Sequence, residues 1–124
     1  MYPMFFTYSQ MITGRMWAPQ QDTPSNRITW GGCITTNNYL MPYMSANMTG
    51  SYTSIYGYEK TCFYNSVKAP NYLMAVVVGA FDQGEIVNFG GYDTYVLAEP
   101  NVLASALSEF SNLQQIVQTV ELYV

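Results

Sequence analysis

Hydrophobic and polar residues alternate along much of the first eighty positions, and this alternation predicts half-buried β-strands. In residues 27–36, for example, Ile28, Trp30 and Ile34 fall on one face of an extended chain. Residues 72–81 are instead continuously apolar, as expected of a strand buried on both faces. Strands are expected over residues 1–6 (an edge strand), 27–36, 39–46, 61–68, 72–81 and 92–99. The fold class is therefore mainly β, with a largely antiparallel sheet.

Glycine and small polar residues mark the predicted breaks between these strands. Gly31 and Gly32 indicate a bulge or a close approach by neighbouring backbone. Residues 47–57 are typical of a surface loop, and the glycine-rich residues 82–91 are typical of a connector. We place a domain boundary within this connector, which gives domains of residues 1–86 and 87–124.

Apolar residues recur at helical spacing only near the end of the chain. The first set is Leu103, Ala106, Leu107 and Phe110, and the second is Leu113, Ile116, Val117 and Val120. Asn101 is the expected N-cap. The two sets predict either one bent helix or two short ones, so that the chain ends on a strand-helix segment.

Low charge is the unusual property of the composition. Only 10% of the residues are charged, which suggests that much of the surface is covered by a partner. A net charge of −4 with four cationic residues provides no basic surface for nucleic acid. No apolar run is long enough to span a membrane as a helix, and no signal peptide is visible. We therefore expect a cytoplasmic protein that binds neither nucleic acid nor membrane.

Titratable chemistry is sparse in this sequence. There is no histidine, the acidic residues are scattered singly, and no catalytic group or metal ligand set can be assembled. Cys33 and Cys62 could face each other across paired strands, but two cysteines without histidines are more often plain buried thiols. We predict buried thiols and no cofactor in this chain.

The most distinctive stretch is residues 6–25, FTYSQMITGRMWAPQQDTPS. A helical turn that begins near residue 9 should end before Pro19, because proline disfavours helix at the preceding residue. Asp22 is expected to close an Asx turn and to pair with Arg15. Core positions are predicted for Met11, Met16 and Trp17.

This stretch resembles a motif of the zinc metallo-aminopeptidases, in particular the leukotriene-A hydrolase and aminopeptidase B branch. The family motif is approximately FTQCQ, a helical turn with arginine, and then PCQDTPS, and it aligns here without a gap. Residues 70–80 also resemble the family segment P-x-YL-x-A-x-VVG-A. The resemblance implies the end of a saddle-like N-terminal β-domain followed by the truncated start of a catalytic domain.

The resemblance also implies a function, although the HEXXH and GxMEN motifs of the family are missing from this chain. Gln10 stands at the family position that contacts the amino-terminal residue of a peptide substrate, and Tyr8 replaces a second glutamine there. Alternatively, Gln10 satisfies only backbone groups of its own turn. The full-length parent is expected to bind zinc and to provide the surface that covers this chain. The rival hypothesis is a non-catalytic structural or protein-interaction module, packed in a larger assembly.

Overall fold

The computed structural model describes residues 3–53, 56–89 and 92–123. It is mainly β with antiparallel sheets, which confirms the predicted fold class. Contacts divide the chain into two compact units, Met1–Ala80 and Phe81–Val124, and each is described by itself.

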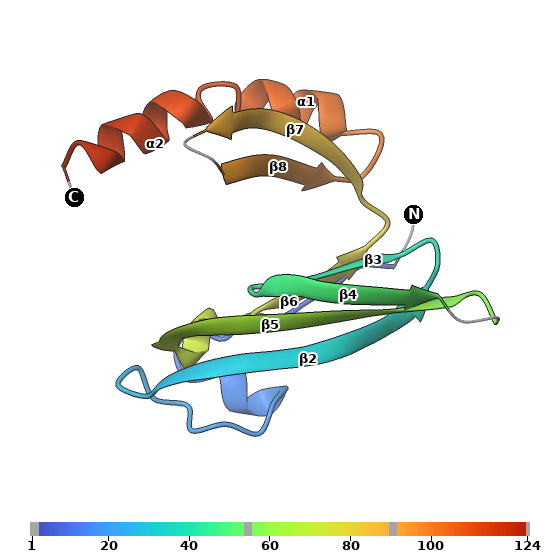
Figure 1. Cartoon of the computed structure of the whole chain (residues 1–124), viewed down its shortest axis with the longest axis vertical. Coiled ribbons are helices and arrows are strands. Elements are labelled where there is room, and N and C mark those ends of the chain that lie inside the picture. The colour runs from blue at the N-terminus through green and yellow to red at the C-terminus, as the bar shows by residue number, and fades with distance from the viewer. Residues whose placement is uncertain (1–2, 54–55, 90–91, 124) are drawn as a thin grey trace. The chain divides into compact units, whose positions relative to one another are not determined.

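The first unit contains two three-stranded antiparallel sheets (Figure 1). One sheet has the order β1-β6-β3, with β1 at Phe5–Phe6, β6 at Val76–Gly79 and β3 at Met41–Met44. The other has the order β2-β5-β4, with β2 at Arg27–Asn37, β5 at Tyr58–Pro70 and β4 at Asn47–Thr53. The predicted edge strand at residues 1–6 is thus confirmed for Phe5–Phe6, whereas Met1 and Tyr2 lie outside the described residues.

The core of this unit lies where alternation predicted it. Trp30, Phe63 and Val76 are buried. The Trp30 indole Nε1 donates to the backbone oxygen of Ser45 at 3.1 Å, which satisfies the polar edge of the buried ring. The Ser45 hydroxyl in turn donates to the Leu73 carbonyl at 2.7 Å and accepts from the Ala75 amide at 2.8 Å. This network connects β2, β3 and the segment that leads into β6.

Gly31 is a point of close approach between β2 and β5. A β-carbon there would lie 2.8 Å from the Phe63 carbonyl oxygen and 2.9 Å from the Tyr64 ring. The register irregularity lies between Ile28 and Trp30 instead. Of the two explanations offered for the glycine pair, close backbone approach is the one that the structure supports.

Two predictions about residues 47–81 were wrong. Residues 47–53, expected in a surface loop, form β4 and pair with β5. The strand expected over residues 72–81 is reduced to β6, because a 3-10 helix at Asn71–Leu73 (η2) precedes it. β6 is nevertheless the central strand of its sheet, with Val76 and Gly79 buried.

The prediction of buried free thiols was also wrong, because Cys33 and Cys62 form a disulfide. They are directly opposed in the register of β2 and β5, with a Cα–Cα distance of 4.0 Å. Cys33 is exposed and Cys62 is half-buried, so the bond lies on the outer face of the sheet.

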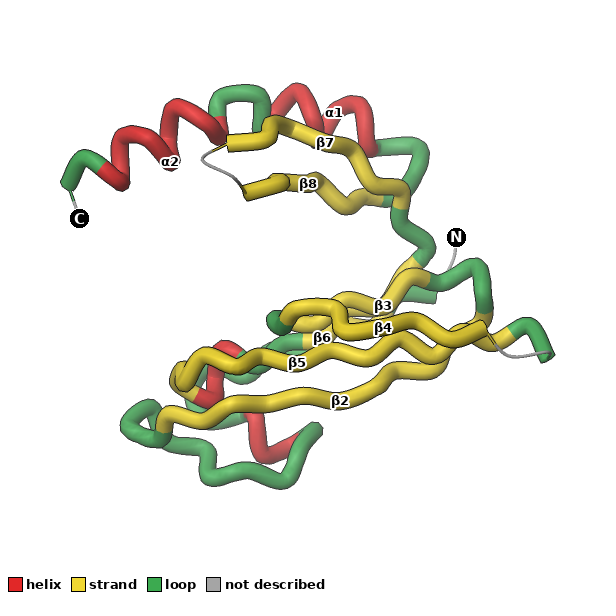
Figure 2. The backbone as a smooth tube through the Cα atoms, viewed as in Figure 1, coloured by secondary structure: helices red, strands yellow, loops and turns green. Residues whose placement is uncertain are grey.

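The second unit is a β-hairpin that contacts two short helices (Figure 2). β7 (Asp82–Phe89) pairs with β8 (Tyr92–Ala98), and α1 (Leu103–Glu109) and α2 (Leu113–Glu121) follow. The expected strand at residues 92–99 is confirmed, but the expected connector at residues 82–91 was wrong over β7. Gly84 lets Leu107 pack against β7, because a β-carbon there would lie 2.8 Å from Leu107 Cδ1.

The apolar periodicity of residues 103–120 corresponds to two helices rather than one bent helix. The N-cap of α1 is Val102 rather than Asn101, and it makes no side-chain capping hydrogen bond. The assignment of residues 1–86 and 87–124 to two domains of a longer protein stays a prediction.

Candidate functional site

The stretch from Phe6 to Ser25 runs mostly as a loop between β1 and β2 (Figure 2). After β1 it contains the 3-10 helix η1 at Gly14–Met16, which ends before Pro19 as predicted but begins at Gly14 rather than near residue 9. Buried Ser9 anchors the loop. Its hydroxyl donates to the Met74 carbonyl at 3.3 Å and accepts from the Trp17 indole at 2.9 Å.

Arg15 and Asp22 fix the far end of this loop. Asp22 Oδ2 accepts from the Arg15 backbone amide at 3.1 Å and from Arg15 Nε at 3.4 Å. Arg15 NH2 also donates to the Asp22 carbonyl at 3.3 Å. The predicted ion pair is confirmed. The Asp22 side chain, which is only 2% exposed, makes these contacts with Arg15 in place of the expected Asx turn.

Asn71 joins the loop to the η2 helix from fifty residues away. It is fully buried, and its Nδ2 donates to the Gln21 carbonyl. The sequence analysis did not identify Asn71 or its neighbour Tyr72 as part of the site. No local signal could have found them, because only the tertiary fold brings residues 71–72 beside residues 10–24.

Met11 and Ile12 adopt the left-handed backbone conformation, with φ of 57° and 61°. This conformation is uncommon for non-glycine residues and is a clear outlier for β-branched isoleucine. Thr13 supports the bend, since its hydroxyl lies 2.8 Å from the carbonyl oxygens of both Tyr8 and Gln10. Such strain costs about 1–3 kcal/mol per residue and is concentrated at functional sites in proteins.

The backbone strain at Ile12 can be measured by comparing two substitutions. We expect Ile12→Gly to be more stable than Ile12→Ala by about 0.5–1 kcal/mol, because glycine adopts positive φ without a steric cost. At Met16, a more exposed residue outside the positive-φ region, the order should reverse, with alanine more stable than glycine. Urea unfolding of the four variants provides the measurement. The same order at both positions would contradict the strain.

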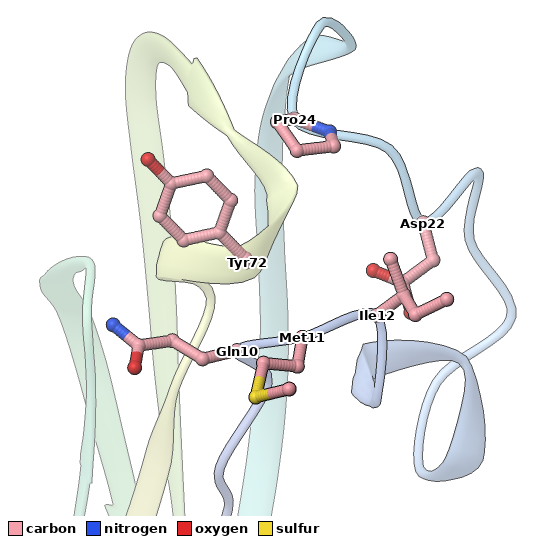
Figure 3. A pocket seen from close by; sticks show the side chains of 6 residues that line it. All are labelled: Gln10, Met11, Ile12, Asp22, Pro24 and Tyr72. Carbon is pink, nitrogen blue, oxygen red and sulfur yellow. The ribbon is translucent and has the colours of Figure 1, made fainter.

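The loop and the η2 helix line an open pocket of about 350 Å³ (Figure 3). It is lined by Gln10, Met11, Ile12, Asp22, Pro24 and Tyr72. Figure 3 shows the Gln10 amide and the Tyr72 hydroxyl on one side of the pocket and Ile12 with Asp22 on the other. The pocket thus combines an apolar lining with polar groups at its edges, as small-molecule and peptide sites do.

The two predicted substrate-binding residues lie together. The Tyr8 hydroxyl donates to Gln10 Oε1 at 2.7 Å, and both side chains are exposed. The prediction of core positions was wrong for Met11 and Met16, whose side chains are 87% and 83% exposed. Trp17 is half-buried. Met11 is one of the residues that line the pocket.

Within residues 3–53, 56–89 and 92–123, no group of three or more histidine, cysteine, aspartate or glutamate side chains could hold a metal ion.

A second hollow, of about 310 Å³, lies along β1, β3 and β6 and includes Tyr43. Burial raises the pKa of the Tyr43 phenol above its ordinary value. Among the described residues, no helix is long and apolar enough to cross a membrane.

The chain is similar to leukotriene A-4 hydrolase from Xenopus laevis, with 28% identity over 122 residues that cover 97% of this chain and 19% of that protein. It is also similar to aminopeptidase B from Mus musculus, with 28% identity over 111 residues that cover 90% of this chain and 16% of that protein. No family model matches. The chain therefore spans less than a fifth of the length of these curated relatives.

Proposed function

We propose that this chain is a segment of a leukotriene-A-hydrolase-like zinc aminopeptidase, in which it presents Gln10 to the amino end of a peptide substrate. The observation that supports this most is the pocket itself. The stretch that resembles the family motif forms it, and the Gln10 amide lies at its edge. Similarity to two such hydrolases over nearly the whole chain supports the same proposal.

Tyr8 has a defined part in this proposal. A carboxamide oxygen accepts two hydrogen bonds, and the Tyr8 hydroxyl occupies one of these positions on Gln10 Oε1. The second position can accept from the protonated amino group of a substrate. Tyrosine in place of the second glutamine of the family therefore orients Gln10 and leaves one residue to contact the amine.

The remaining chemistry belongs to the parent protein in this proposal. Residues 1–86 are the end of the N-terminal β-domain and residues 87–124 the start of the catalytic domain. Zinc bound elsewhere in the parent activates the water that attacks the peptide bond. We propose a cytoplasmic enzyme whose 124-residue segment neither binds zinc nor cleaves an aminoacyl anilide by itself.

The test is Gln10→Ala in the full-length protein, assayed with an aminoacyl anilide. We expect kcat/KM to fall by about tenfold to a hundredfold, because a hydrogen bond to a charged amine contributes about 1.5–3 kcal/mol. Zinc content should stay unchanged, since Gln10 is not a ligand in this proposal.

Gln21→Ala is the matched control in the same loop. Its side chain is exposed and only its carbonyl contacts Asn71, so alanine retains that contact. Unchanged kcat/KM in Gln10→Ala, with activity and zinc present in the wild type, would refute the role of Gln10. A full-length protein without HEXXH and without activity would refute the enzyme itself.

The second candidate is a non-catalytic module packed in a larger assembly, and α2 supports it. Ile116 and Val120 are 50% and 55% exposed, and Leu122 beyond the helix is 83% exposed. An amphipathic helix with an uncovered apolar face is typical of an element that packs against further protein. In the first proposal, the protein that covers this face of α2 is the rest of the parent. The module hypothesis requires other chains instead and predicts no downstream HEXXH.

A further inference from the structure

We propose that the Cys33–Cys62 disulfide is a thiol-exchange site, which an external dithiol reduces reversibly while β2 and β5 stay paired. The proposal is independent of the proposed peptidase activity. It rests on three features of the bond: its place in the sheet register, its exposure, and the positive charge of Lys60, two positions away on the same face of β5.

The sheet does not need this bond to hold its register. Cys33 and Cys62 are opposed within a continuous ladder, because Gly32 pairs with Phe63 and Ile34 pairs with Thr61 on either side. The buried side chains of Trp30 and Phe63 hold the same two strands from the opposite face. Breaking the bond therefore removes a link between residues that backbone pairing and core packing already keep together.

Exposure of Cys33 leaves its sulfur atom accessible, whereas Cys62 is half-buried. Gly31 precedes Cys33 on the same face of β2, and Gly50 is opposed to Cys62 on β4. Neither glycine leaves empty space there, because a tyrosine ring lies beside each of them. The rings of Tyr64 and Tyr52 lie against these glycines, within 3.5 Å of the positions that their β-carbons would occupy. Because β2 is an edge strand and Cys33 is exposed, a small thiol can approach its sulfur directly.

Lys60 is the charged residue closest to the bond along β5. It lies two positions before Cys62, on the same outer face, and it is exposed. Its neighbour Glu59 falls on the opposite side of the strand, where it accepts a hydrogen bond from Ser51. A nearby ammonium stabilises a thiolate, so Lys60 favours release of the Cys62 sulfur as the leaving group.

The exchange follows from this arrangement. The thiolate of a dithiol attacks the exposed Cys33 sulfur, a mixed disulfide forms there, and the S–S electron pair leaves on the Cys62 sulfur. The second thiolate of the dithiol then attacks the reagent sulfur of the mixed disulfide, and the Cys33 thiolate leaves. Two protons from the dithiol complete two protein thiols, and the dithiol ends as its cyclic disulfide. The protein gains two electrons, and the dithiol loses two.

The rate of reduction by dithiothreitol, in native buffer and in denaturant, tests the proposal. An exposed, exchange-competent bond should react in the native protein within about tenfold of its rate in the unfolded chain. Alkylation and mass spectrometry count the thiols, and circular dichroism follows the strands. A native rate more than about a thousandfold slower would show that reduction waits for unfolding and would overturn the proposal. So would loss of the strand signal on reduction.

Lys60→Glu and Lys68→Glu form a matched pair on β5. The first places a carboxylate beside the Cys62 sulfur and should slow native reduction at least about threefold. The second makes the same charge change farther along the strand and should leave the rate unchanged. Equal effects of both would exclude the role of Lys60. The double variant Cys33→Ser with Cys62→Ser should retain its strand signal, and its failure to fold would contradict fold-retaining reduction.

Discussion

Replacing Trp30 with alanine is expected to lower the free energy of unfolding by about 3–5 kcal/mol, a large part of the stability of a domain this size. The ring is buried in the core of the first unit, and alanine would leave a cavity in its place. It would also leave the Ser45 carbonyl without its indole donor. Urea unfolding followed by Trp17 fluorescence reports on this unit, because Trp17 is the other tryptophan of the chain.

Trp30→Phe separates the two contributions. Phenylalanine retains most of the buried ring but cannot donate to Ser45, so we expect a loss of about 1–3 kcal/mol, with the unpaired carbonyl as one cause. If the alanine variant lost no more stability than the phenylalanine variant, the ring would not be a main part of the core.

Gly31→Ala is expected to destabilise the first unit by about 1–3 kcal/mol, although it adds only one methyl group. That methyl group would meet the Phe63 carbonyl oxygen at 2.8 Å, and a backbone atom cannot rotate away as a side chain can. Strands β2 and β5 would have to separate locally, next to the Cys33–Cys62 pair. Thermal unfolding followed by circular dichroism measures the effect.

Gly32→Ala is a sharp control, because the two glycines are adjacent in one strand. A β-carbon at Gly32 would have Met44 Cε as its nearest neighbour, at 3.8 Å, which is ordinary contact. Alanine there should be neutral, or stabilising by about 0.4–1 kcal/mol through a less flexible unfolded chain. Similar losses at both positions would mean that the close approach of β2 and β5 is not specific to Gly31.

The disulfide and the proposed cytoplasmic location bear on each other. Reducing systems keep most cytosolic thiols free, and the disulfides found there are usually transient, catalytic or redox-sensing. An accessible bond on an edge strand is compatible with that behaviour, because the strands it joins are also held by backbone pairing. Measuring its reduction therefore also informs the choice of compartment.

Alternation alone identified the strands that have one buried face. Residues 27–36 and 61–68 were predicted as strands, and Trp30 and Phe63 are buried as their patterns required. β4 was missed because nearly all its side chains are exposed, and an edge strand without a buried face carries no alternation to read. β7 was missed for a related reason: its first residues are polar or glycine, and they resemble a connector.

The sequence by itself determined the mainly β fold class, the turn before Pro19, the Arg15–Asp22 pair and the resemblance of residues 6–25 to the aminopeptidase motif. These features depend on residues close together in the chain, whose geometry and side-chain chemistry act locally. Only the tertiary structure decided that Cys33 meets Cys62, that Asn71 and Tyr72 complete the pocket beside Gln10, and that Met11 and Ile12 are strained. The disulfide and the pocket depend on strand register and on packing between segments 29 and 50 residues apart, which no local pattern encodes. The strain at Met11 and Ile12 is a property of the folded backbone that their side-chain types did not predict.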